Sequence, residues 1–277
     1  MKTALVGFTT NVTVNLHKIK VWVKSFKKYC SNSSIYLIVA NGSIAELNSL
    51  NDLGISVVNI GIDHKDLFFI NHKRLLYTKN LLLDLKEELI LITDVFDVIF
   101  QNDPFLRLDI QKFDLFFTIE GIKIKQSPWN SDVINKIFPE HLKACIDQEV
   151  ICSGIIAGKR QHLINLLSSM YYLCEKTSNA HNIKDQAALI VLAYSMKSID
   201  SKIKYMNLND AWVVNCAVAG PTKYFENWGF KKIITTQYKH IPILENGYVG
   251  INNDIYDIVH QFNRIPNWHR ELTKNYE

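Results

Sequence analysis

The sequence predicts an α/β fold built on a parallel sheet that helices cover on both faces. Short apolar runs of strand length recur in the first 100 residues, at 4–8, 35–40, 55–60 and 89–93. Stretches with helical spacing of apolar residues separate these runs. With 277 residues, 48% of them hydrophobic, the chain has enough apolar material for a large core. Strands that alternate with helices in this way are typical of a parallel sheet.

The segments between the runs carry the helix signals. Apolar residues at helical spacing predict helices over 14–29, 44–53 and 71–85. Thr9, Thr10 and Asn11 predict a loop and a cap before the first helix. Gly54 suits the C-terminal cap of the second. Because ligands of such sheets bind at the carboxyl ends of the strands, we expect the chemistry just beyond these ends.

The second half of the chain is less regular. Strands are expected over 115–120, 150–157 and 256–260, and helices over 159–175 and 185–194. Beyond Lys204 the signals are weak and mixed, and no internal repeat is visible. The sequence therefore defines the architecture less completely here than in the first half.

Composition limits the classes of function. The net charge of +4 is too mild to indicate nucleic-acid binding, and it suits an anionic ligand or a weak, peripheral association with an anionic membrane surface. No apolar run reaches about 18 residues, and no signal-peptide core follows Met1. The five cysteines show no CxxC spacing and are expected to be reduced core residues. We therefore expect a cytoplasmic protein.

An acidic pair follows the fourth strand. Asp94 and Asp97 come directly after the run LILIT, which is predicted to be a buried strand. Two carboxylates held close together in such a place are costly, and a divalent cation removes that cost. Mg²⁺ or Mn²⁺ takes one or two carboxylates together with substrate phosphates. Alternatively, Asp94 caps a turn and Asp97 pairs with a lysine, and the spacing alone leaves both readings open.

The acidic pair and the segments VIF at 98–100 and DPF at 103–105 resemble the DxD region of GT-A glycosyltransferases. The resemblance is nearest to retaining families, the glycogenin-like and the bacterial lipooligosaccharide galactosyltransferases. It implies a Rossmann-like mixed sheet flanked by helices. The spacing departs from the family pattern, because Asp94 and Asp97 form DxxD. Asp97 is thus the implied metal ligand, and Asp94 binds either the metal or the donor ribose.

Two further motifs follow in the family's order. Ser153 and Gly154, after Cys152, resemble a strand whose small residues let the backbone approach the donor sugar, although a tight strand crossing would also require them. Asp185 and Gln186 resemble the pair that, in retaining enzymes, holds donor hydroxyls and lies near the anomeric carbon. Asp185 is equally suited to be a helix N-cap.

The remaining implied site residues lie at the two ends of the chain. His260 resembles the third protein ligand of the metal, since neutral imidazole binds Mn²⁺ well, although a lone histidine is also common in cores. Arg264 and Arg74 suit the donor phosphates, or else a surface carboxylate and solvent. The donor nucleotide is expected at the end of the first strand, at Phe8, Thr9, Thr10 and Asn11.

The resemblance covers residues 1–264 and implies a metal-dependent hexosyltransferase of polysaccharide biosynthesis. Its cofactor would be Mn²⁺ or Mg²⁺, its donor a UDP-sugar and its acceptor a glycan or glycoconjugate, with retention of configuration. Residues 1–277 would form one domain, with a nucleotide-binding half at 1–105 and a sugar- and acceptor-binding half at 106–277. Trp129 and Trp212 either stack on the acceptor or lie in the core.

Two other readings remain. A sugar-nucleotide nucleotidyltransferase would share the fold and the metal, but residues 7–13 lack the glycine-rich, arginine-containing loop that cradles a triphosphate. A catalytically inactive, carbohydrate-binding protein of the GT-A type would tolerate the altered DxxD spacing.

Overall fold

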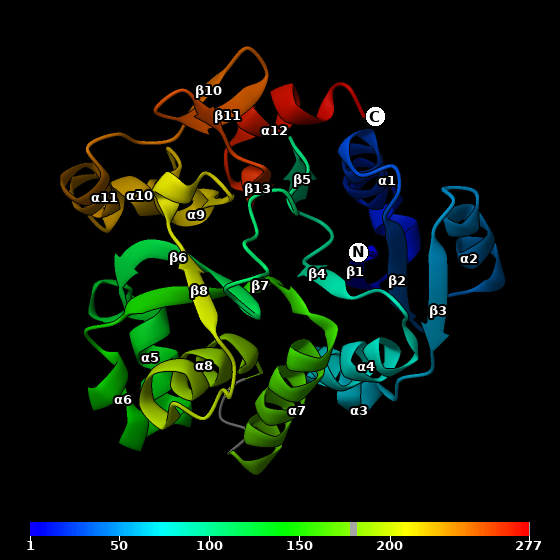
Figure 1. Cartoon of the computed structure of the whole chain (residues 1–277), viewed down its shortest axis with the longest axis horizontal. Helices are drawn as coiled ribbons and strands as arrows, with labels where there is room; N and C mark the ends of the chain where they lie inside the picture. The colour runs from blue at the N-terminus through cyan, green and yellow to red at the C-terminus, as the bar shows by residue number, and fades with distance from the viewer. Residues whose placement is uncertain (178–181, 277) are drawn as a thin grey trace.

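The computed structural model describes residues 1–177 and 182–276, and a seven-stranded sheet forms its centre (Figure 1). In spatial order the strands are β3 (Ser56–Ile60), β2 (Ser34–Ala40), β1 (Thr3–Thr10), β4 (Leu89–Thr93), β7 (Glu149–Lys159), β6 (Leu115–Lys123) and β8 (Ile203–Met206).

The sheet is parallel in one half and mixed in the other. Strands β3, β2, β1 and β4 run parallel, as the alternation of strands and helices predicted. Strand β7 is antiparallel to both β4 and β6, and β8 is parallel to β6. The whole is therefore the mixed α/β sheet with flanking helices that the resemblance implied.

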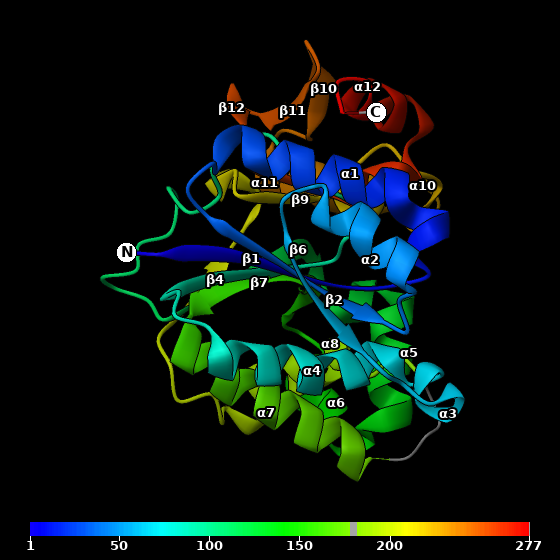
Figure 2. The same ribbon diagram turned by 90° about the vertical axis from the view of Figure 1, so that its right-hand side faces the viewer.

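Helices cover both faces of the sheet, as Figure 2 shows. One face carries α1 (Val12–Tyr29) and α2 (Ile44–Asn51), and the other carries α4 (Ile70–Asp84) and α7 (Arg160–Lys176). Successive side chains of β1 enter different cores because they point to opposite faces. Leu5 packs in the same cluster as Trp22 of α1, whereas Val6 packs in the same cluster as Leu82 of α4.

The other elements of the main body and the C-terminal part are short. The helices are α3 (His64–Leu67), α5 (Pro128–Ile137), α6 (Pro139–Cys145), α8 (Asp185–Ile190), α9 (Cys216–Ala219), α10 (Lys223–Asn227), α11 (Phe230–Tyr238) and α12 (Pro266–Thr273). A π-helical segment, Val191–Met196, continues α8. Three-residue 3₁₀ turns occupy Ile124–Gln126, Leu208–Asp210 and Phe262–Arg264. Strands β10 (Ile243–Glu245), β11 (Tyr248–Ile251) and β12 (Asp254–Ile255) form a small antiparallel sheet.

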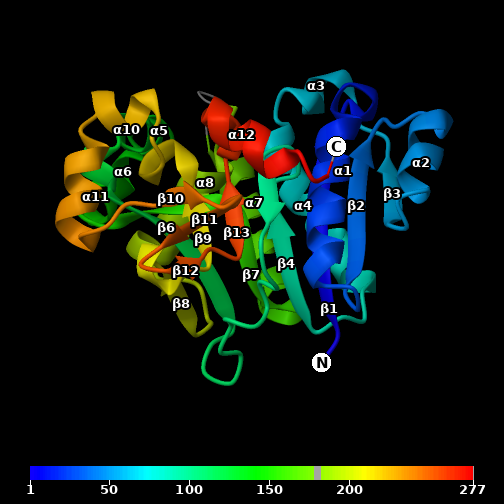
Figure 3. The same cartoon turned by 90° about the horizontal axis from the view of Figure 1, so that it is seen from above.

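A third sheet carries the end of the chain back to the centre of the molecule. Strand β13 (Ile258–His260) lies between β5 (Val98–Phe100), to which it is antiparallel, and β9 (Val213–Asn215), to which it is parallel. Figure 3 shows β9 and β13 over the β6–β7 part of the main sheet. The register pairs His260 with Val98 and with Asn215. His260, near the C-terminus, thus lies opposite Val98, the residue that follows Asp97.

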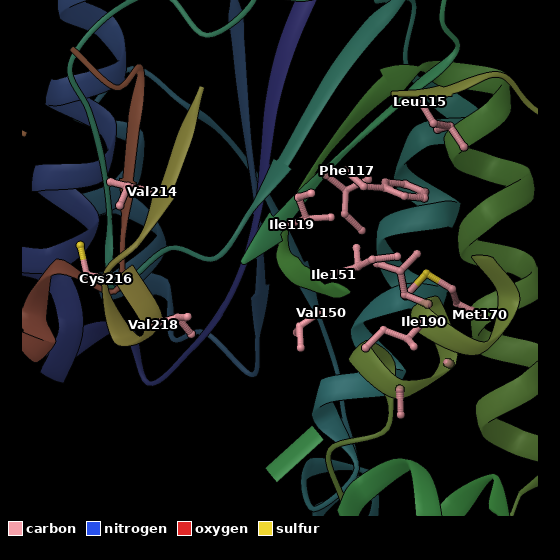
Figure 4. Close-up of a cluster of buried hydrophobic side chains, with 14 of the residues drawn as sticks. Leu115, Phe117, Ile119, Val150, Ile151, Met170, Ile190, Val214, Cys216 and Val218 are labelled. Carbon is pink, nitrogen blue, oxygen red and sulfur yellow. The ribbon is translucent and has the colours of Figure 1, made fainter. Parts of the chain in front are cut away.

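The larger core extends between the sheet and α7 and α8, where Phe117 and Ile151 face Met170 and Ile190 (Figure 4). All four side chains are almost inaccessible to solvent. Fully burying side chains of this size contributes about 1.5–3 kcal/mol each. Strand β6, which carries Phe117 and also Glu120, is therefore firmly anchored in the core.

Two expectations about element ends were wrong. Thr9 and Thr10 do not form a loop, because they continue β1 and pair with Val39 and Ala40 of β2. Asn11 alone connects β1 to α1, with a left-handed φ of 51° and no capping bond from its side chain. The expected strand over 256–260 begins only at Ile258. The preceding Tyr256 is instead fully buried and donates its hydroxyl proton to the carbonyl of Leu208, at 3.0 Å.

Among the described residues, no helix is both long enough and apolar enough to cross a bilayer. All five cysteines are buried and free, in agreement with their expected place in the core.

Candidate active site

The acidic pair and the late histidine converge at the carboxyl end of β4. Asp94 is held by its backbone, whose N–H donates to the carbonyl of Gly154 at 2.7 Å. The carbonyl of Asp97 accepts from the N–H of Gln261 at 2.7 Å. His260 Nε2 lies 3.5 Å from Asp94 Oδ2 and 3.8 Å from Asp97 Oδ1. The three predicted ligands thus each offer one atom, all within 4.8 Å of one another.

The chemistry of these three residues fits a divalent cation. His260 is 1% exposed, and its Nε2 is buried without a hydrogen-bond partner in the described structure. Its other ring nitrogen, Nδ1, lies 3.6 Å from the sulfur of Cys152. Burial opposes a charge on the imidazole, but Cys152, Asp94 and Asp97 raise the pKa of His260 well above its usual value. The cluster therefore attracts positive charge, as a proton on His260 or as a metal ion, and carboxylate and imidazole suit Mn²⁺.

The two carboxyl groups of the pair have different environments. Burial raises the pKa of Asp97, against the opposing effect of His260. Burial acts in the same direction on Asp94, but Arg74 and His260 outweigh it and lower the pKa of that carboxyl. Asp94 is therefore the firmly ionised member, and Asp97 is the member for which an added cation brings the larger change.

Arg74 joins Asp94 to a third carboxylate. From α4 its Nη1 donates to Asp94 Oδ1 at 2.6 Å, and its Nη2 donates to Asp185 Oδ2 at 2.7 Å. Burial alone would lower the pKa of Arg74, but the two carboxylates outweigh burial and raise this pKa above its usual value. The alternative in which Asp185 caps its helix is wrong, because Lys184 occupies the N-cap and the Asp185 carboxylate points to Arg74. The alternative of a solvated Arg74 is also wrong.

Gly154 is a position at which an added side chain would force its neighbours to shift. Because β7 is antiparallel to β4, with Ile155 opposite Thr93, Gly154 lies beside the first residue after β4. A Cβ atom there would stand 2.6 Å from Asp94 Oδ2 and 2.8 Å from His260 Cε1. The β7 backbone therefore approaches the acidic cluster closely at Gly154, and the approach to a donor sugar stays a prediction.

Gln186 is held between β7 and α5. Its Oε1 accepts from the N–H of Ser153 at 3.3 Å, and its Nε2 donates to Asn130 Oδ1 at 2.8 Å. Asn130 in turn donates to Ser127 Oγ at 2.9 Å. The amide of Gln186 is thus fixed in position by contacts to two separate elements.

A cavity of about 520 Å³ lies over these residues. Eight of the predicted site residues line it, namely Arg74, Asp94, Ser153, Gly154, Asp185, Gln186, His260 and Arg264. Asp97 is not part of this lining, but its Oδ1 lies 3.8 Å from His260 Nε2. The expected nucleotide contacts at the end of β1 lie outside the lining, namely Phe8, Thr9, Thr10 and Asn11. Thr9 is 1% exposed and Phe8 stacks on Tyr77.

Sequence reasoning missed a carboxyl group on the same cavity. Glu120 of β6 is buried and accepts from Asn215 Nδ2 at 2.7 Å. Burial raises the pKa of Glu120 to about 7. A charged residue inside the apolar run LFFTIEGI was a usable signal, whereas Asn215, on a three-residue strand, gave none.

The structure separates the two tryptophans that the sequence could not tell apart. Trp212 is fully buried and donates its indole N–H to the carbonyl of Pro104 at 3.0 Å. Trp129 lines the cavity and is 38% exposed. Three aromatic residues that sequence reasoning did not single out line the cavity as well, namely Tyr224, Trp228 and Phe230. The guanidinium of Arg264 lies 5.9 Å from the centre of the Tyr224 ring.

Comparison with known proteins identifies the architecture. The structure is similar to the crystal structure of galactosyltransferase LgtC in complex with donor and acceptor sugar analogues, with a TM-score of 0.54. The match covers 93% of this chain and 86% of that chain at 12% sequence identity. Neither a protein-family model nor a curated protein sequence matches this chain. The similarity establishes the GT-A type of α/β fold that the sequence motifs implied.

Proposed function

We propose that this protein is a metal-dependent glycosyltransferase. It moves a hexose from a nucleotide-sugar, a UDP-sugar, to a hydroxyl group of a glycan or glycoconjugate with retention of configuration. The observation that carries the proposal is the convergence of Asp94, Asp97 and His260 within 4.8 Å beside a cavity. The GT-A fold supports it, because the similar galactosyltransferase was solved with donor and acceptor sugar analogues. Residues 1–277 would form a single domain of this type.

In this proposal, Asp97, His260 and Asp94 hold Mn²⁺ or Mg²⁺. When bound there, the metal would neutralise the charge that develops on the departing nucleotide diphosphate. Asp94 keeps its contact with Arg74, which leaves Oδ2 as the oxygen nearest to His260. The imidazole would be held in its ligating orientation by Cys152 at Nδ1. Arg264 on the cavity wall would contribute a guanidinium to the diphosphate.

The donor sugar would lie over Asp185 and Gln186. Arg74 holds one oxygen of the Asp185 carboxylate and thereby orients the group toward a sugar hydroxyl. The fixed amide of Gln186 would lie beside the anomeric carbon, and the acceptor hydroxyl would attack from the face of the leaving group. Loss of the hydroxyl proton to a phosphate oxygen of the leaving diphosphate completes the step. Retention would be contradicted by an inverted anomer in an NMR assay of the product.

The donor nucleotide is proposed to contact the carboxyl end of β1, at Phe8, Thr9, Thr10 and Asn11. Strand β1 pairs with β4 up to Gly7 and Thr93, so this end lies beside the start of the acidic segment. The single-residue connection at Asn11 leaves no loop to cradle a triphosphate, which disfavours a nucleotidyltransferase.

A thermal-shift panel tests the proposal. UDP, GDP, CMP and dTDP are each added with and without Mn²⁺ to the wild-type protein, to Asp97→Asn and to Asp109→Asn, which changes an exposed aspartate away from the site. We expect UDP to raise the melting temperature only with Mn²⁺. A ligand at 100 times its Kd stabilises the native state by about 2.7 kcal/mol. Asp109→Asn should keep this shift and Asp97→Asn should lose it.

Three results would contradict the proposal. They are the absence of a metal-dependent shift with any nucleotide, an unchanged shift in Asp97→Asn, or a donor that binds but is neither hydrolysed nor transferred. The last result would instead support a carbohydrate-binding protein without activity.

A further inference from the structure

The cavity has aromatic lining residues in addition to the charged residues of the acidic cluster. Its aromatic lining comes from Trp129 at the start of α5 and from Tyr224, Trp228 and Phe230 around α10 and α11. Figure 1 places α5, α10 and α11 on the β6 side of the molecule, away from β1–β3. We refer to these four residues as the aromatic wall.

Exposure distinguishes the two tryptophans of the wall from the other three in the chain. Trp22 and Trp212 are fully buried, and Trp268 is 6% exposed. Trp129 and Trp228 are 38% and 42% exposed, and both open onto the same cavity. Folding favours the burial of an indole ring, so indole surface that stays exposed in a cavity is typical of a binding site. Two such side chains from distant segments indicate a ligand with an apolar face.

The ring of Trp228 is held before any ligand arrives. Its centroid lies 5.1 Å from that of Tyr224, and it meets Phe230 edge to face at 5.5 Å and 82°. The backbone N–H of Trp228 donates to the carbonyl of Tyr224 at 3.1 Å. Thr222 caps α10 by accepting from the N–H of Phe225. A rigid aromatic surface loses little conformational entropy when it binds.

Polar groups line the same cavity as the wall. The Glu120 carboxyl lines the cavity and is held by Asn215, but one such bond leaves further acceptor capacity. A purely apolar ligand, such as an acyl chain, would leave this remaining acceptor capacity of the buried carboxyl unused. A pyranose ring offers both chemistries, because its C–H bonds form an apolar face and its hydroxyls surround the ring.

We propose that the aromatic wall and Glu120 form a subsite for a pyranose ring, which stacks on Trp228 with Trp129 nearby and donates a hydroxyl to Glu120. The role of this ring as the acceptor rests on the proposed function. The binding itself does not depend on it. The acceptor is thereby assigned to carbohydrate, the end of a glycan, rather than to a protein hydroxyl or a lipid alcohol.

Saturation-transfer NMR on the nucleotide-free protein tests the subsite. The probes are methyl β-D-galactopyranoside, methyl β-D-glucopyranoside and methyl α-D-mannopyranoside, with glycerol as a hydroxyl compound that has no ring. We expect at least one glycoside to receive saturation on the C–H protons of one face, and glycerol to receive none. Trp228→Ala should weaken this binding about tenfold, and Trp228→Phe should lose less, because a smaller aromatic face remains.

A matched control is Tyr172→Ala, which removes an exposed aromatic residue of α7 that is 62% exposed and does not line the cavity. It should leave glycoside binding unchanged. The subsite is overturned if no glycoside binds the wild type, or if Trp228→Ala and the double variant with Trp129→Ala both bind as the wild type does.

The same variants separate this inference from the proposed function. With the subsite intact and the proposed function wrong, glycosides bind through Trp228 but no nucleotide produces a Mn²⁺-dependent shift. With the proposed function right and the subsite wrong, nucleotides produce the shift and Trp228→Ala leaves the acceptor KM unchanged. When both hold, Trp228→Ala raises the acceptor KM about tenfold and preserves the Mn²⁺-dependent UDP shift.

Discussion

The two parts of the cavity are assembled in different ways. At the acidic cluster, Asp94, Arg74, Asp185 and His260 come from four separate segments, and a chain of contacts links His260 to Asp94, Asp94 to Arg74 and Arg74 to Asp185. In the aromatic wall, three of the four rings lie within seven consecutive residues, Tyr224–Phe230, and contact their own neighbours. Removal of one charged member leaves a buried opposite charge without its partner, whereas removal of one ring only reduces contact area. The effects of substitutions should therefore be strongly non-additive in the cluster and nearly additive in the wall.

Among the substitutions that test this comparison, Arg74→Met is expected to have the largest effect on stability and on donor turnover. The substitution leaves Asp94 and the almost fully buried Asp185 without their shared cation. Breaking a buried pair on one side costs about 3–5 kcal/mol, which should appear as a lower midpoint of urea unfolding. Donor turnover should fall by about a hundredfold or more, because the orientation of both carboxylates is lost.

Arg107→Met is the matched control for this experiment, because Arg107 pairs with the buried Asp257 away from the cavity. It should lower stability but leave Mn²⁺-dependent UDP binding intact. An Arg74→Met protein with wild-type donor turnover would show that the ion pair does not organise the site.

A smaller effect is expected from Gly154→Ala. The new methyl group would overlap Asp94 and His260, and overpacking of this kind costs about 1–3 kcal/mol. Because the displaced atoms belong to the proposed ligands, Mn²⁺ affinity measured by calorimetry should fall about tenfold or more. Gly61→Ala is the control, since nothing lies within 4 Å of the added methyl. Equal metal affinity in the two variants would contradict the close-packed arrangement.

The smallest effect on Mn²⁺ binding, but a distinct pH dependence of stability, is expected from Glu120→Gln. Burial raises the pKa of Glu120 from 4.5 to about 7, so the folded protein binds this proton more tightly than the unfolded chain. The contribution of Glu120 to the free energy of unfolding is fully present below its pKa of 4.5 in the unfolded chain. It is lost as the pH rises through its pKa of about 7 in the folded protein. It amounts to about 3 kcal/mol between pH 4.5 and 8.

Urea unfolding at pH 5, 6, 7 and 8 measures this contribution. The wild type should lose stability over this range more steeply than Glu120→Gln, whereas Glu140→Gln, at an exposed position, should follow the wild type. Parallel pH profiles for the wild type and Glu120→Gln would contradict the raised pKa of this buried carboxyl.

The sequence predicted the first half of the fold well because its strands have five to eight residues, are rich in apolar residues and are separated by helices with clear periodicity. Strands β5 and β9 have three residues each, and such segments carry too little pattern to be recognised. They form only because β13 returns between them, which is a tertiary effect. The extension of β1 through Thr10 likewise depended on the length of its partner β2.

The acidic part of the site was predictable because its residues interrupt apolar runs or follow them directly. Asp94 and His260 stand at the ends of buried strands, where a charge needs an explanation. The aromatic wall had no equivalent signal, because Trp129 and Trp212 look alike in sequence and only burial tells them apart. The roles of all these residues in catalysis stay predictions.

The order of the contacts along the chain has a consequence for how the site is assembled during synthesis on the ribosome. Asp94 and Arg74 are only 20 residues apart, so their ion pair can form as soon as α4 and β4 have left the ribosome. His260 emerges near the end, after β9 and most of the C-terminal part. Through this long interval the growing chain carries an internal counterion for its acidic segment. The arginine can thus balance part of the negative charge of this segment before His260, the last residue of the proposed metal site, has been synthesised.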